Sequence, residues 1–129
     1  MTSITIPNSV TTIGSSAFSG CTGLTSIVLP DSITTIDRCT FEDCSALTSI
    51  NIPESVTTIG EEAFDSCRSL TSITIPNSVT TIGTSAFYYC LKLVEVTLPE
   101  SVETIGDYAF RSCDALTSIN IPNKITILN

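Results

Sequence analysis

Residues 70–92 read LTSITIPNSVTTIGTSAFYYCLK, and this stretch recurs with small changes along the whole chain. Its opening leucine recurs at a constant interval, at Leu24, Leu47, Leu70, Leu93 and Leu116, and Met1 stands one period earlier. We number positions 1 to 23 of each coil from this residue. The 129 residues then form one domain of five coils, 1–23, 24–46, 47–69, 70–92 and 93–115, followed by a partial coil, 116–129.

Three further positions keep one residue type in every complete coil. Position 7 holds all the prolines. Position 18 holds all the phenylalanines, which are Phe18, Phe41, Phe64, Phe87 and Phe110. Position 21 holds the cysteines Cys21, Cys44, Cys67, Cys90 and Cys113. Such a fixed period predicts stacked coils, in which the phenylalanine and cysteine columns form structural ladders inside the core.

The pattern within a coil predicts its local structure. Positions 3 to 6 alternate polar and apolar residues, which indicates a short strand, and the proline ends its ladder. Positions 10 and 13 predict a second extended segment. Position 14 is glycine, with Asp37 as the exception, which suggests a positive φ. The A-F-x-x-C segment predicts one helical or 3₁₀ turn.

The predicted fold is therefore a right-handed solenoid of about 5.5 coils, with a parallel β-sheet on one face and short helical or 3₁₀ turns on the other. Positions 1, 4, 6, 10, 13, 17, 18 and 21 are expected to face inward. No coil can bury these side chains alone, so each one depends on its neighbours for stability.

The motif L-x-x-I-x-I-P-x-S-V-x-x-I-G-x-x-A-F-x-x-C, repeated once in each coil, resembles the BspA-like (Treponema-type) leucine-rich-repeat family. The resemblance implies a leucine-rich-repeat superhelix in a surface or secreted protein of bacteria or some parasitic protists. It implies adhesion to a protein or glycan on a host or neighbouring cell. It carries over the framework residues, whereas ligand contacts would lie in the non-consensus positions.

Composition excludes several function classes. The net charge is -8, so binding to nucleic acid is not expected. The chain has no histidine, which removes the commonest general base and metal ligand, and we expect neither an enzyme nor a cofactor. No apolar run approaches the ~20 residues of a membrane span, so membrane insertion is not expected. Residues 1–7 lack a signal-peptide pattern, so the chain would be cytoplasmic if complete.

The cysteines are expected to be reduced core thiols. Stacked side chains stand about 4.8 Å apart, whereas a disulfide brings Cβ atoms to roughly 3.5–4.5 Å. A disulfide or a metal site remains an alternative, although the C-x₂-C pairs typical of zinc are missing. Cys39 stands apart at position 16, where we expect an exposed thiol.

Two polar arrays could suggest ligands. Paired threonines at positions 11 and 12 are similar to ice-binding surfaces, but neighbouring residues of a strand point to opposite sides. Position 8 carries acidic residues that could form a calcium row, namely Asp31, Glu54 and Glu100. They are interspersed with asparagines rather than forming triplets, so this row is read as a solvated turn edge. The threonine rows are read as β-propensity and solubility.

The non-consensus surface supplies the candidate binding residues. Tyr88, Tyr89, Tyr108 and Arg111 fall on adjoining coils around the predicted turn, and tyrosine and arginine are typical of interface hot spots. A second candidate is the outward face of the strands. Its polar and shallow surface comprises Asn51, Thr74, Glu95 and Thr97. Unselected variation on a repeat is the alternative interpretation of the tyrosine and arginine set.

Two functions remain open on the sequence. The first is a non-catalytic module that binds a protein or glycan, and the second is a structural spacer without a ligand. Exposed tyrosine and arginine favour the first, and the regular repeat favours the second. Both ends, at Met1 and Ile127-Leu128-Asn129, lack a polar cap, which predicts possible end-to-end self-association.

Overall fold

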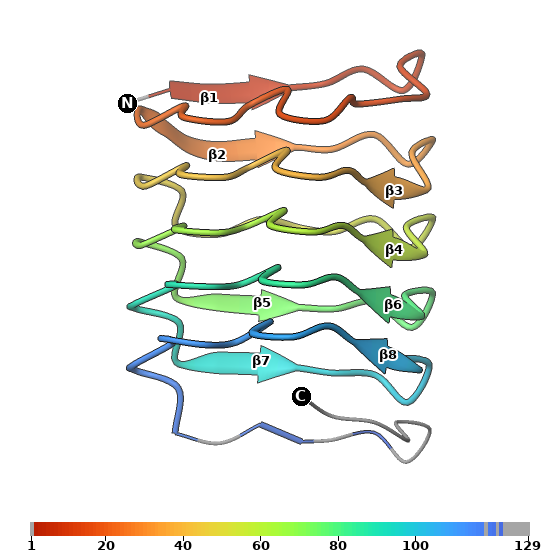
Figure 1. Ribbon diagram of the computed structural model, residues 1–129. Coiled ribbons are helices and arrows are strands. Elements are labelled where there is room, and N and C mark those ends of the chain that lie inside the picture. The colour runs from red at the N-terminus through yellow and green to blue at the C-terminus, as the bar shows by residue number, and fades with distance from the viewer. Residues whose placement is uncertain (1, 118, 121, 123–129) are drawn as a thin grey trace.

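A computed structural model describes residues 2–117, 119, 120 and 122. The coils lie one beneath the next, from the red N-terminal coil to the blue coils at the other end (Figure 1). Every strand pairing is parallel and joins neighbouring coils, as when Ile59 lies opposite Ile82 and Thr74 opposite Thr97. The predicted solenoid is thereby confirmed. The two ends at which self-association is expected, Met1 and Ile127-Leu128-Asn129, lie outside the described residues.

Strands occupy two sides of the coil. On the first side lie β1 (Thr2–Thr5), β2 (Leu24–Val28), β5 (Ser72–Thr74) and β7 (Glu95–Thr97). They pair as β1-β2 and β5-β7. A bridge between Val28 and Asn51 continues this side into the third coil, where Thr48 N–H also donates to Thr25 O at 3.3 Å.

The second side is more continuous. It carries β3 (Thr35–Ile36), β4 (Thr58–Ile59), β6 (Thr81–Ile82) and β8 (Thr104–Ile105), which form one sheet in the order β3-β4-β6-β8. The second extended segment expected at position 13 is thus confirmed. It begins at the second coil and has no counterpart among the described residues of the first.

The prediction of a helical turn on the third side is wrong, because the described residues contain no helix. Alternate amides there point along the stack: Glu62 N–H donates to Thr84 O at 2.9 Å, and Phe64 N–H donates to Ala86 O at 2.8 Å. The amides between them close short turns, as Asp65 N–H does to Glu62 O at 3.2 Å. A helix needs all of these amides for bonds within the segment, so it cannot coexist with this ladder.

The prediction of a positive φ at position 14 is also wrong. Left-handed residues occur instead at positions 16 and 20, where Glu62 has φ 55° and Gly20 has φ 73°. Glycine recurs at position 14 because the preceding coil is too close for a side chain. A Cβ on Gly83 would stand 2.6 Å from Glu61 N and 2.7 Å from Gly60 C.

The core lies between the three sides and contains all eight predicted inward columns. The phenylalanine rings form a continuous stack with centroids 5.2–5.7 Å apart and planes within 14° of parallel. Phe41, Phe64 and Phe87 are completely buried.

The cysteine column lines the same core, and all six cysteines of the chain, including Cys39, carry free thiols. Each column thiol from the second to the fifth coil donates to the phenylalanine carbonyl of the coil before it. Cys67 Sγ lies 3.2 Å from Phe41 O, and Cys90 Sγ lies 3.2 Å from Phe64 O. The column therefore ties the coils together through hydrogen bonds as well as packing.

Candidate interaction surface

The third side of the coils, which carries the short turns and which we call the turn side, displays the variable side chains. Its ladder directs positions 17, 18 and 21 into the core and leaves positions 16, 19 and 20 at the surface in most coils. Because the backbone hydrogen bonds hold every coil in the same conformation, these outward positions can vary in sequence without changing the fold. This side is where the sequence placed the tyrosine candidates.

The structure brings those candidates into two contacts. Tyr88 and Tyr89 stack with ring centroids 5.9 Å apart, and the Arg68 guanidinium lies 5.2 Å from the centre of the Tyr89 ring. In the next coil, the Arg111 guanidinium lies 5.1 Å from the centre of the Tyr108 ring. Tyr89 N–H donates to Arg111 O at 2.9 Å, so the two groups adjoin.

We call Arg68, Tyr88, Tyr89, Tyr108 and Arg111 the tyrosine surface. Sequence reasoning missed Arg68, which belongs to the coil before that of Tyr89. The coil period could have indicated this contact between Arg68 and Tyr89, because it places position 22 of one coil near position 20 of the next.

Two of these tyrosines stand at the left-handed positions 16 and 20 of the coil. Tyr89 has φ 63° and Tyr108 has φ 60°, a region that bulky residues rarely adopt. The other coils fill these two positions mainly with glycine, serine or short acidic residues. Both tyrosine side chains are nonetheless exposed, 37% for Tyr89 and 53% for Tyr108. Each of these tyrosines is therefore partly buried and partly open to solvent.

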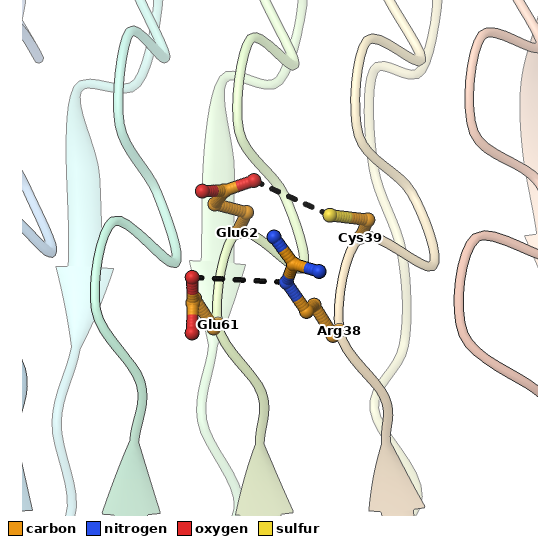
Figure 2. Close-up of polar contacts among 4 residues, drawn as sticks. All are labelled: Arg38, Cys39, Glu61 and Glu62. Carbon is orange, nitrogen blue, oxygen red and sulfur yellow. Dashed lines mark hydrogen bonds and ion pairs between the residues drawn. The ribbon is translucent and has the colours of Figure 1, made fainter.

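A second cluster lies on the same side, nearer the N-terminus. Cys39 Sγ donates to Glu62 Oε2 at 3.3 Å, and Figure 2 shows the thiol pointing at this carboxylate from the neighbouring coil. The ligand atoms of Cys39, Glu42 and Glu62 all lie within 4.8 Å of one another. The expectation of an exposed Cys39 is wrong, because its side chain packs between two coils and is only 6% exposed.

Electrostatics make this thiol unreactive. Burial and the neighbouring carboxylates raise the pKa of Cys39 to about 12. The thiolate is the form that attacks electrophiles and binds metals, so either reaction must first remove a tightly held proton. Arg38 does not neutralise the cluster, because it pairs with Glu61 at 3.7 Å on the exposed surface (Figure 2). Burial also raises the pKa of Asp65.

The strand-face candidates lie on a different side of the coil. Thr74 is in β5, Glu95 and Thr97 are in β7, and Asn51 forms the bridge to Val28. All four candidates are exposed. The structure brings Thr74 and Thr97 together as opposite residues of one sheet, and it brings none of them to the tyrosine surface.

The paired threonines lie on the second side of the coil. Thr57 is exposed and Thr58 is half-buried. The Thr57 hydroxyl donates to the Thr34 carbonyl at 3.3 Å, which ties up one row within the stack.

These features define a class of protein: a leucine-rich-repeat solenoid whose variable side chains stand on a regular turn face. The family model described as "BspA type Leucine rich repeat region" matches residues 1–93 and 34–129, in six copies. The chain belongs to this family. No match was found among curated proteins.

Solved structures of bacterial proteins share the fold. A leucine-rich repeat protein from Bacteroides ovatus is 39% identical, with TM-score 0.84, over 96% of this chain and 38% of that one. The T. pallidum leucine-rich repeat protein is 35% identical, with TM-score 0.89, over 93% and 58%. A leucine-rich cell surface protein from Faecalibacterium prausnitzii is 27% identical, with TM-score 0.57, over 96% and 48%. This chain thus spans about two fifths to three fifths of their lengths.

The chain is similar to a cell-surface protein, and no helix within its described residues is long and apolar enough to cross a membrane.

Proposed function

We propose that this chain is a non-catalytic interaction module of a surface or adhesion protein. It binds a protein or glycan on a host or neighbouring cell through the tyrosine surface. The supporting observation is that Tyr89 and Tyr108 keep exposed rings at left-handed positions, where other coils carry small or polar residues. Strained residues of this kind are common at binding sites, where function outweighs the local cost.

The chemistry of the surface suits recognition. Tyrosine offers a large rigid face and a polar hydroxyl, and arginine offers a planar set of donors. Arg68 and Arg111 each lie against a ring, and such a cation–π contact favours one orientation of the side chain. Prior ordering lowers the entropy lost on binding.

Cell-surface placement is part of the same proposal. It is supported by the likeness to the F. prausnitzii cell surface protein and by membership of the BspA-type family. An adhesive module needs an exposed face that can vary while the scaffold stays constant, and the turn side meets that requirement.

The test is biolayer interferometry of the purified chain against a panel of matrix proteins and glycans. The binding variant is Tyr89→Ser/Tyr108→Ser, which installs the serine that other coils carry at both positions. The control is Thr74→Asn/Thr97→Asn, which installs the asparagine that Asn51 provides at the same position on the strand face. We expect a ligand that binds the wild type and the control at least tenfold more tightly than the tyrosine variant.

Two results would contradict this assignment. Binding kept by the tyrosine variant and lost by the control would move the site to the strand face. No binding at ~100 µM, where even weak recognition is detectable, would favour the structural spacer. The spacer alternative is supported by the hydrogen-bond ladder of the turn side, which repeats at every joint between the five complete coils.

A further inference from the structure

The joint between the first and second coils differs from the others at position 14. There the second coil has Asp37, whereas the three coils after it have Gly60, Gly83 and Gly106. A Cβ on any of those glycines would come within 2.4–2.9 Å of backbone in the preceding coil. Real Cβ atoms do not approach that closely, so Asp37 requires a wider separation from the first coil than glycine does.

The wider separation is accompanied by a difference in the backbone hydrogen bonds between the coils. Gly60 N–H donates to Ile36 O at 2.7 Å, and Thr57 N–H donates to Thr34 O at 2.8 Å. The later coils repeat both bonds. In the described chain the equivalent amides, of Asp37 and Thr34, make no such bond to the first coil.

The gap is confined to one side of the joint. The first and second coils remain paired through β1 and β2, and Phe18 N–H donates to Thr40 O at 2.9 Å on the turn side. Only the side that would extend the four-stranded sheet is open, and that sheet accordingly begins at β3. Asp37 thus separates one corner of two otherwise joined coils.

A cavity of about 140 Å³ occupies this corner. It is lined by Thr11, Thr12, Ile13, Thr34, Thr35 and Asp37. We call it the seam cavity. It lies between the first and second coils, on a different side of the coil from the tyrosine surface, which spans the third to fifth coils.

The seam cavity combines hydrogen-bond donors with acceptors. The amides of Thr34 and Asp37 and the carbonyls of Thr11 and Ile13 would be paired in any later joint, and here they are free of that pairing. Threonine hydroxyls can donate or accept, and the Asp37 carboxylate accepts. Ile13 also lines the cavity, although its side chain is buried in the core.

We propose that the seam cavity binds a single neutral sugar residue, such as the end of a glycan chain. A sugar ring presents several hydroxyls that both donate and accept, and it also presents an apolar C–H face. The cavity is smaller than the roughly 300 Å³ at which pockets for larger ligands begin, which limits it to one ring. The Asp37 carboxylate disfavours acidic sugars, since like charges would meet.

This proposal is independent of the tyrosine surface, and it is tested with different variants. The probes are the methyl glycosides of glucose, galactose, mannose and N-acetylglucosamine, at about 10 mM. Binding to the full chain is measured by saturation-transfer difference NMR. We expect at least one glycoside to bind the wild type, and the Tyr89→Ser/Tyr108→Ser variant equally well.

The decisive variant is Asp37→Gly, which restores the repeat residue and should close the corner. Binding should weaken at least tenfold, and the amides of residues 34 and 37 should gain protection from hydrogen exchange. Asp37→Asn keeps the wider joint and should retain weaker binding. The proposal is overturned if no glycoside binds the wild type, or if Asp37→Gly gains amide protection and binds the sugar as before. Amide protection in the wild type as high as in Asp37→Gly would also overturn it, because the corner would then be closed already.

Discussion

Replacing Phe64 by alanine tests the energetic role of the phenylalanine stack. The Phe64 side chain is completely buried, and its ring lies 5.3 Å from that of Phe41 and 5.2 Å from that of Phe87. Truncating a buried phenylalanine to alanine removes about 3–5 kcal/mol of stability. That range includes two ring pairs, each contributing about 0.5–1.5 kcal/mol beyond burial.

Phe18 supplies the matched comparison. It stands in the first coil, is only partly buried, and stacks on one side against Phe41 at 5.7 Å. We expect Phe18→Ala to lower the free energy of unfolding by about half as much as Phe64→Ala, because less area and one ring pair are lost. Phe64→Leu keeps most of the volume but loses both ring pairs, so it should lose about 1–3 kcal/mol, less than Phe64→Ala.

The assay is urea denaturation followed by far-UV circular dichroism, with the slope m compared among the variants. A constant m with a lower midpoint reports lost stability of one cooperative unit. A lower m for Phe64→Ala would show that the coils on its two sides unfold separately. The reasoning is refuted if Phe64→Ala loses less than about 1 kcal/mol, or no more than Phe18→Ala.

Three further outcomes follow from the structure. Gly83→Ala should destabilise by about 1–3 kcal/mol, because its Cβ would meet the preceding coil, whereas Gly14→Ala, with nothing within 4 Å, should change stability by less than about 0.5 kcal/mol in the same assay. A rise in the pKa of Cys39 from 9.0 to about 12 depletes its thiolate about 1,000-fold. The thiolate that remains is more nucleophilic because its pKa is higher, which offsets part of this loss. Alkylation of Cys39 at pH 8 should therefore be roughly 30-fold slower than that of an ordinary thiol. Glu62→Ser should speed it, as peptide mass spectrometry can measure; an unchanged rate would show that the carboxylate has no influence. Because the folded state raises the pKa of Asp65 above its ordinary 3.8, folding binds a proton there, and stability should rise as the pH falls through the folded pKa and level off below 3.8. Asp65→Asn should reduce that rise, and an identical pH profile would contradict it.

The repeat made most of the fold predictable. Its constant period identifies which side chains share a column, and apolar columns must face inward wherever coils stack. The core of the central coils therefore follows from sequence alone, and so do both extended segments. The proline at position 7 marks the end of the first one because it has no amide to donate.

The turn side shows where this reasoning fails. A-F-x-x-C fits one helical turn locally, but the neighbouring coil supplies carbonyls that accept alternate amides. That competition is invisible in a single coil. The adjacent coil also explains the glycine at position 14. The backbone of that coil approaches too closely for a side chain, and the φ of the glycine itself is not the constraint.

For the candidate sites, too, some features follow from the sequence and others only from the tertiary structure. Sequence alone determined the coil period, the residues of the core columns, and the presence of tyrosine and arginine at variable positions. Only the tertiary structure added Arg68 to Tyr89, buried Cys39 against Glu62, and opened the corner beside Asp37. The physical reason is that a repeat specifies which positions meet in neighbouring coils, whereas the distance between those coils depends on the side chains and backbone that pack between them.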